Sequence, residues 1–191
     1  IDLSQSLLQK MLTINTDEVY DKLYFGQLFD RVIPFISFIG CVVVNRNLWQ
    51  QREKTRYFGT EFIHVGVIFQ SPLPDPALVV ATPYITIRYG NAQWWTRAFE
   101  VLFFKWPALL QSFESIPEDI RYKHQTRITM RTIAIFRAKG AFTLKSIKKL
   151  YAMKDYGLIW KFGALVIAVI PGYVLNMFIM AYYKVLSNAS P

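Results

Sequence analysis

The longest uncharged stretch of the chain constrains its fold more than any other feature. It runs over 22 residues from Phe162 to Tyr183, with the sequence FGALVIAVIPGYVLNMFIMAYY. At 1.5 Å per residue, a helix of this length would extend roughly 33 Å, close to the bilayer hydrocarbon thickness of about 30 Å. The stretch therefore predicts membrane association, either as a spanning helix or as a buried or in-plane helix kinked at Pro171.

Most of the positive charge lies just before this stretch. The chain has 22 Lys and Arg against 13 Asp and Glu, a net charge of +9, and eleven of the cations fall between Arg121 and Lys161 with Asp155 as the only acid there. Such a field attracts phosphate, and the adjoining apolar stretch favours anionic membrane lipid over nucleic acid. The cationic flank also predicts that the preceding part of the chain is cytoplasmic.

Upstream of the basic block the pattern predicts an α/β part. Two apolar stretches rich in β-branched residues, 33–45 and 77–90, predict strands. Between them, Thr60 has the side chain of a helix N-cap, so a helix is expected to begin near Glu61. From Trp95 the pattern becomes helical, and this order predicts an α/β half-domain followed by helices.

Prolines and glycines divide the helical part. Pro107 is expected to interrupt the first helix, Pro117 to open the next one, and Gly140 to break the basic helices. The expected domains are residues 1–116, which contain the sheet, residues 117–161, which form basic juxtamembrane helices, and residues 162–184, the hydrophobic membrane segment.

The N-terminus and the single cysteine give weaker signals. The chain begins with Ile1 rather than Met and shows no signal peptide, which indicates a processed chain or a piece of a longer one. Cys41 lies in the apolar run FIGCVVV and is expected to be a small core residue. No disulfide can form within the chain, which fits a cytoplasmic location.

Glu61 and His64 are the first candidate site residues. Three residues apart at the start of the expected helix, they would share one face near its N-terminus. A carboxylate can deprotonate a hydroxyl, an imidazole can orient it, and the helix N-terminus can hold a nearby phosphate. The alternative is that Glu61 assists the helix cap and that His64 is a partly buried structural histidine.

A second candidate cluster lies in the segment TIRYGNAQWWTR. Arg88 can pair with phosphate through two parallel hydrogen bonds, Asn91 can hydrogen-bond a hydroxyl, and Trp94 can pack on a sugar ring, with Arg97 close behind. The alternative is a structural arginine, a turn asparagine and a core tryptophan.

Several motifs of known chemistry are absent from the sequence. It has no phosphate-binding GxxxxGK[ST] or GxGxxG, no HExxH, and no Cys and His set for zinc. It also has no Asp-x-Asp pair, so no metal site is predicted within this chain.

Two longer strings, FGTEFIHVGVIFQ and TPYITIRYGNAQWWTRAFEVLFFKWPALLQSF, resemble bacterial family 2 glycosyltransferases. The resemblance extends from about Phe35 to the C-terminus and is closest to enzymes that add a sugar to lipid-linked glycan precursors of the cell envelope. It implies an A-type glycosyltransferase fold, with a Rossmann-like sheet. Residues 1–116 would then be the C-terminal, acceptor-binding half of that domain, and residues 162–184 its membrane-associated tail.

The resemblance also implies an activity and a set of ligands. The expected reaction is an inverting transfer, of a hexosyl or related group, from a nucleotide sugar to a lipid-linked glycan acceptor. Glu61 would be the base with His64 beside it, while Arg88, Asn91 and Trp94 would line the acceptor or diphosphate side. A divalent cation, Mg or Mn, is expected in the full-length protein, with ligands outside this chain. The alternative is a non-catalytic, membrane-anchored scaffold that binds lipid phosphates.

Overall fold

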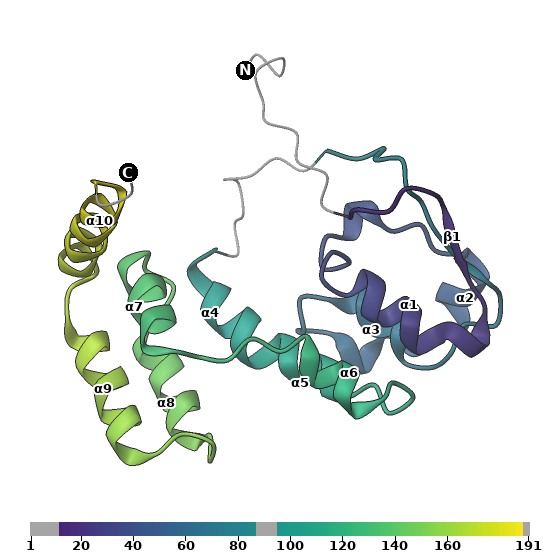
Figure 1. Cartoon of the computed structure of the whole chain (residues 1–191). Helices are drawn as coiled ribbons and strands as arrows, with labels where there is room; N and C mark the ends of the chain where they lie inside the picture. The colour runs from purple at the N-terminus through teal and green to yellow at the C-terminus, as the bar shows by residue number, and fades with distance from the viewer. Residues whose placement is uncertain (1–11, 87–94, 189–191) are drawn as a thin grey trace. The chain divides into compact units, whose positions relative to one another are not determined.

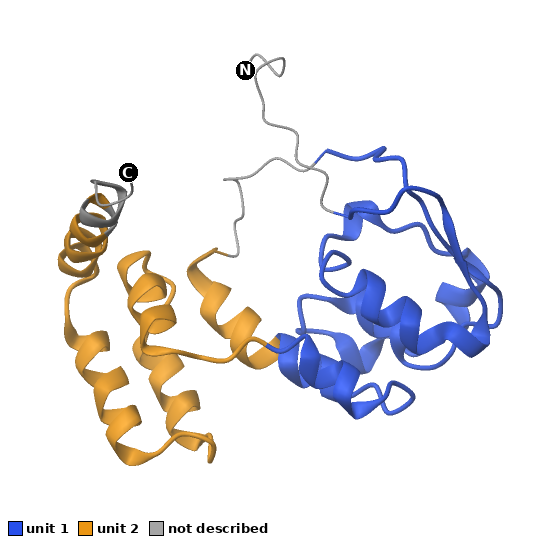
Figure 2. Ribbon diagram, in the orientation of Figure 1, with its two compact units in different colours: residues 1–91, 106–125 blue, residues 92–105, 126–191 orange. Residues whose placement is uncertain are grey.

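The computed structural model describes residues 12–86 and 95–188 of the chain (Figure 1). The chain divides into two compact units, which Figure 2 distinguishes by colour. Unit 1 comprises residues 1–91 and 106–125, and unit 2 comprises residues 92–105 and 126–191.

The predicted Rossmann-like sheet is wrong. Within the described residues the sheet has two strands, β1 (Glu18–Tyr20) and β2 (Ala77–Val79), which pair antiparallel with Val19 opposite Leu78. Two antiparallel strands of three residues cannot make the parallel, doubly wound sheet of an A-type glycosyltransferase. The described part of the chain is instead mostly helical.

The stretch 33–45 shows why the strand prediction failed. It folds as successive turns and a 3-10 helix, η3 (Ile39–Cys41), and the amide of Ile36 donates to the carbonyl of Val32 at 2.9 Å. Only Ile33 and Ile36 are buried, and their spacing of three belongs to a helical turn rather than to an alternating strand. The prediction that Cys41 is a core residue is also wrong, because this residue is exposed.

Unit 1 is built around helices that surround an aromatic core. Its helices are α1 (Phe25–Val32), α2 (Arg46–Gln51), α3 (Ile63–Phe69), α5 (Trp106–Gln111) and α6 (Glu118–Lys123), with 3-10 turns η2 (Lys22–Tyr24) and η4 (Thr55–Tyr57). The rings of Phe29 and Phe69 pack edge to face at 5.0 Å, and Phe113 packs against both. These rings fix α1 against α3 and against the end of α5.

Arg52 closes the C-terminal end of α3. Its guanidinium donates to the carbonyls of Val67, Ile68, Ser71 and Pro72, and three of these bonds measure 2.8–2.9 Å. A helix leaves its last four carbonyls without partners inside the helix, and this one planar side chain satisfies two of them together with two carbonyls of the following loop.

Unit 2 contains the remaining helices. They are the 3-10 turn η5 (Trp95–Arg97), α4 (Ala98–Glu100), the π-helical turn η6 (Val101–Lys105), α7 (Met130–Ala138), α8 (Leu144–Ala152), α9 (Leu158–Val169) and α10 (Gly172–Asn188). Its core includes Phe99, Ile133, Phe142 and Leu150, all fully buried, with Ala164 of α9.

The predicted helix breakers act close to where the sequence places them. The interruption predicted at Pro107 falls earlier, because Pro107 is the second residue of α5 and the helical turns take the π form at Val101–Lys105, just before α5. Pro117 is the N-cap of α6, so the helix it was predicted to open begins one residue later. Gly140 has φ +78° between α7 and α8, which confirms the predicted break.

The prediction of one continuous apolar helix over residues 162–183 is wrong. The stretch is divided between α9 and α10, which are bent by 103°. Pro171 sits in the break, so the kink named as the alternative is confirmed. No helix among the described residues is by itself long and apolar enough to cross a membrane, and only the bent pair of Leu158–Val169 with Gly172–Tyr182 meets that test.

Candidate functional site

Glu61 lies in the turn that precedes α3, not on the helix. Its side chain is exposed, and the helix that was predicted to begin near Glu61 begins two residues later, at Ile63. The hydroxyl of Thr60 donates to the carbonyl of Tyr57 at 2.8 Å and accepts from the amide of Phe62 at 3.1 Å. Thr60 therefore closes a local turn instead of capping α3.

The backbone of Glu61 is strained. Its φ is +74°, and no other residue except glycine has a positive φ within residues 12–86 and 95–188. A side chain in the left-handed region brings Cβ against the following carbonyl and costs about 1–2 kcal/mol. Strain of this kind gathers at active sites and ligand-binding segments, where a side chain must point in a particular direction. The structure thus displays one carboxylate at the surface at a free-energy cost.

His64 lies in a different environment from Glu61. It is buried within α3, and its Nε2 lies 2.7 Å from the carbonyl oxygen of Ile36, so this nitrogen carries the hydrogen and donates it. Burial lowers the pKa of His64 and keeps the ring neutral. The structure does not place the two side chains on one helical face, and the contacts of His64 are those of a structural residue that joins α3 to the turns after α1.

The second predicted cluster lies mainly beyond the described part of the structure. Arg88, Asn91 and Trp94 fall in residues 87–94, outside the described residues. Arg97 ends the turn η5 and is exposed.

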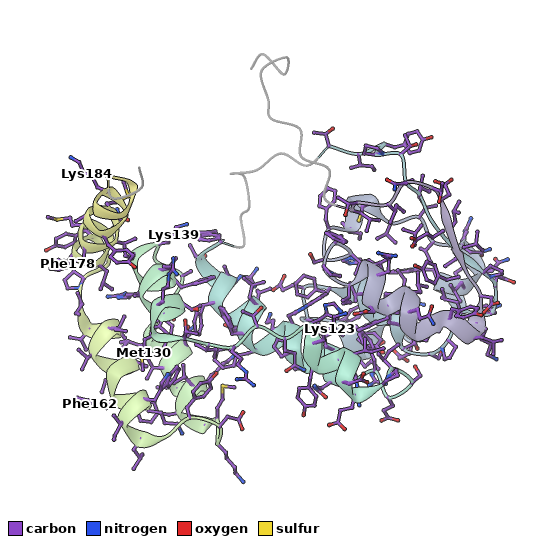
Figure 3. All side chains as sticks on the ribbon, viewed as in Figure 1. Lys123, Met130, Lys139, Phe162, Phe178 and Lys184 are labelled. Carbon is purple, nitrogen blue, oxygen red and sulfur yellow. The ribbon has the colours of Figure 1, made fainter. Side chains whose placement is uncertain are left out.

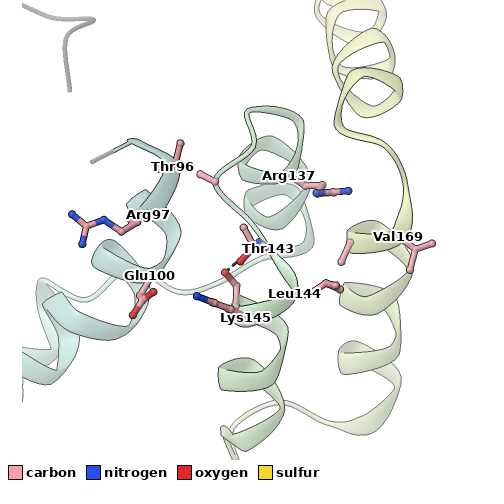
Figure 4. Close-up of a pocket in the computed structure, with 11 residues that line it drawn as sticks. Thr96, Arg97, Glu100, Arg137, Thr143, Leu144, Lys145 and Val169 are labelled. Carbon is pink, nitrogen blue, oxygen red and sulfur yellow. Dashed lines mark hydrogen bonds between the residues drawn. The ribbon is translucent and has the colours of Figure 1, made fainter. Parts of the chain in front are cut away.

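Arg97 borders an open cavity of about 790 Å³ in unit 2 (Figure 4). Residues of the η5 and α4 turns form one wall, the start of α8 a second, and Ala168 with Val169 of α9 a third. In Figure 4 the guanidinium groups of Arg97 and Arg137 point in opposite directions. Glu100, a third lining residue, pairs with Lys149, whose hydrogen bond lowers the pKa of the carboxyl. The two lining arginines therefore do not converge on one point where an anion would sit.

A cluster in unit 1 was not predicted from the sequence. The carboxylate of Asp30 on α1 accepts a hydrogen bond from Lys123 at 2.7 Å and from His124 at 2.6 Å. The hydrogen bond from Lys123, opposed by partial burial and aided by His124, lowers the pKa of Asp30. Lys123 and His124 lie more than ninety residues away along the chain, so no spacing rule could have paired them with Asp30.

The net charge of the protein belongs almost entirely to unit 2. Residues 92–105 and 126–191 contain twelve Lys and Arg against two acids, Glu100 and Asp155, a balance of +10. Unit 1 contains ten Lys and Arg against eleven acids, a balance of −1. The sequence showed a basic block, but the division between units shows that a near-neutral unit is joined to a strongly cationic one.

Unit 2 also exposes large apolar side chains on α9 and α10. Phe162 is 65% exposed and Phe178 is 69% exposed. Both project from the side of these helices that faces away from α7 (Figure 3). Single exposed apolar residues are normal on protein surfaces, whereas a continuous set marks an interaction surface. The strong positive charge and the exposed apolar helices therefore occur on the same unit.

Comparisons with known protein families, with curated proteins and with solved structures find no match to this chain. Among residues 12–86 and 95–188 no group of three or more His, Cys, Asp or Glu is placed to hold a metal ion.

Proposed function

We propose that this chain is the acceptor-side part of a glycosyltransferase that transfers a sugar from a nucleotide sugar to a lipid-linked glycan at the inner membrane. The observation that carries the proposal is the coincidence, on unit 2, of a +10 charge balance with two helices that expose large apolar side chains. Basic and apolar surfaces together favour an anionic membrane, where a lipid-linked acceptor resides.

The sugar-transfer part of the proposal is supported by Glu61. This residue lies in the string FGTEFIHVGVIFQ, which resembles the acceptor side of family 2 glycosyltransferases, and the turn holds it exposed at a positive φ. A carboxylate held in this way can accept the proton of an acceptor hydroxyl without first reorganising. His64, which is buried and neutral, joins α3 to the turns after α1 and is given no part in the proton transfer.

The proposed reaction is a direct displacement. The acceptor hydroxyl gives its proton to Glu61 while its oxygen attacks the anomeric carbon of the donor sugar. A new glycosidic C–O bond forms, the bond from the anomeric carbon to the diphosphate oxygen breaks, and the electron pair leaves with the nucleoside diphosphate. The configuration at the anomeric carbon is inverted. The cation that the resemblance implies has no ligand set among the described residues, so no step is assigned to it.

The proposal is tested with the full-length protein in liposomes that contain a lipid diphosphate-linked saccharide, incubated with a panel of nucleotide sugars. Mass spectrometry of the extracted lipid would detect the added sugar. Glu61→Gln is expected to reduce the rate about 10²- to 10⁴-fold, the usual contribution of a general base. Glu114→Gln, which alters another exposed carboxylate of unit 1, serves as the matched control and should retain the full rate. If Glu61→Gln also transfers at the full rate, the assignment of the base is wrong.

A second candidate function is a non-catalytic scaffold that holds a partner at the membrane through lipid phosphates. It is favoured by the positive charge and the exposed apolar helices of unit 2, because these features explain membrane binding without any catalytic activity. Under this alternative the protein would bind anionic vesicles, but no nucleotide sugar in the panel would yield product.

A further inference from the structure

The two halves of the apolar segment each carry an outward stripe at helical spacing. On α9, exposed apolar side chains recur three to four residues apart at Leu158, Phe162, Val166 and Val169. The one charged side chain of this helix is turned the other way, since Lys161 is buried and its Nζ donates to the carbonyl of Tyr151 at 2.8 Å. The outer face of α9 is therefore apolar over its whole length.

The stripe continues on α10. Tyr173, Met177 and Met180 follow the same spacing, with Phe178 and Tyr182 beside them, and all five are more than half exposed. Met and aromatic side chains suit the boundary between lipid headgroups and acyl chains. Both arms of the bent pair thus offer an apolar face that the rest of unit 2 leaves uncovered.

The bend between the arms is held by α7, which packs against both of them. At the start of α7, Met130 lies so close to Gly163 that a methyl group added there would be 3.0 Å from its Cε. At the end of α7, a methyl group added to Gly172 would be 2.8 Å from the carbonyl oxygen of Arg137. Two glycines therefore permit close contact of α7 with α9 and with the first residue of α10.

A hydrogen bond also holds the joint. In a continuous helix the carbonyl of Ile170 would accept from the amide of Val174, but this amide donates to Pro171 instead, at 3.0 Å. The carbonyl released in this way accepts from Nε of Arg137 at 3.1 Å. Straightening the pair would break this bond and would separate α7 from at least one arm.

Each arm is short relative to a bilayer. α9 has 12 residues and α10 has 17. Their lengths are about 18 Å and about 26 Å, compared with a hydrocarbon thickness of about 30 Å. A pair bent by 103° lies more naturally along a surface than across it.

From the geometry of this joint we propose that α9 and α10 form an in-plane anchor in one leaflet of an anionic membrane, with both ends of the pair on the same side. This inference rests on the proposed membrane function and specifies how the membrane is engaged. The +10 balance of unit 2 selects anionic lipid, and the two apolar faces supply affinity that salt does not screen. The catalytic turn at Glu61 and the C-terminal end of α10 then remain in the same compartment.

The test uses the whole chain with its native thiol removed by Cys41→Ser and with two thiols introduced by Lys154→Cys and Lys184→Cys. These positions lie before α9 and near the end of α10, and both side chains are exposed. The protein is reconstituted into sealed liposomes of phosphatidylglycerol and phosphatidylcholine, treated with a membrane-impermeant maleimide, and analysed by intact mass. Lysing the liposomes with detergent before labelling shows that both thiols can react.

The in-plane anchor predicts chains with two labels or none, whichever way each molecule is oriented, because both thiols lie on one side. A spanning segment would place the thiols on opposite sides and give chains with one label, and this result would overturn the inference while leaving membrane binding intact. If the chain does not float with the liposomes at all, the proposed membrane function fails together with the inference. Flotation therefore separates the two failures, and the number of labels per chain tests the in-plane anchor alone.

Discussion

Replacing Glu61 by glycine should make the protein more stable and less active at the same time. Glycine adopts a φ of +74° without a Cβ clash, so Glu61→Gly removes a penalty of about 1–2 kcal/mol. Glycine also adds about 0.4–1 kcal/mol of conformational entropy to the unfolded chain, which opposes the gain. At the midpoints of these two ranges the net stabilisation is about 0.8 kcal/mol, which corresponds to an increase in Tm of about 2–3 °C for a chain of this size.

The measurement compares three variants by urea denaturation and by the transfer assay. Glu61→Ala keeps a Cβ and should retain most of the strain, and Glu61→Gln keeps both the strain and the shape of the side chain. Neither Glu61→Ala nor Glu61→Gln is expected to show the gain in stability over the unaltered protein that is expected for Glu61→Gly. All three remove the carboxylate, so transfer should fall about 10²- to 10⁴-fold in each of them.

A stability loss in Glu61→Gly of more than about 1 kcal/mol would contradict a strained Glu61. That result would mean that contacts of the glutamate side chain outweigh the backbone strain, so that Glu61 has a structural role. A stable glycine variant that keeps the full transfer rate would instead remove Glu61 from the mechanism.

Three further predictions concern the elements that support this turn. Gly66→Ala should destabilise the protein by about 1–3 kcal/mol in urea, because the new methyl group would lie 2.3 Å from the buried ring of Tyr57. The control Gly157→Ala, with open space around it, should change stability by less than about 0.5 kcal/mol. Burial lowers the pKa of His64 below its usual 6.5, so the stability linked to this residue is present above pH 6.5 and is lost as the pH falls, because the unfolded chain then binds the proton. His64→Gln should flatten the slope of folding stability against pH between about pH 7.5 and 5. An unchanged slope would contradict a buried neutral histidine. Arg52→Lys should lower the folding stability by about 1–3 kcal/mol, because an ammonium group cannot reach the same set of carbonyls at the end of α3. Equal stability of the variant and the unaltered protein in urea would show that those hydrogen bonds contribute little.

The breaks between the helices after residue 95 could be predicted because their signals are local. Pro107, Pro117 and Gly140 act on the backbone within one turn of their own positions, so the sequence alone places the breaks. Pro171 acts in the same way, but its effect depends on α7, which holds the two arms at 103° and cannot be recognised from the apolar composition of the stretch.

The sheet could not be predicted correctly because apolar, β-branched residues fit either a buried strand or a set of packed turns. In the stretch 33–45, the conformation is determined by packing in unit 1, where Ile33 and Ile36 are buried in the core and Val43 is exposed. The candidate site shows the same limit. The position of Glu61 was predicted, but its positive φ was not, and the pairing of Asp30 with His124 depends on tertiary contacts.

Flotation of the 191-residue chain with liposomes tests the central claim most directly, namely that unit 2 places this protein on a membrane. In about 1 M NaCl, where the Debye length is about 3 Å, the chain should stay on anionic liposomes, because the exposed faces of α9 and α10 hold it there independently of charge. Combining Phe162→Glu with Phe178→Glu should release it, while the matched pair Leu23→Glu with Val43→Glu, which adds the same charge at exposed apolar positions of unit 1, should leave it bound. Release of the unaltered chain by salt alone, or equal binding of the two double variants, would contradict the account.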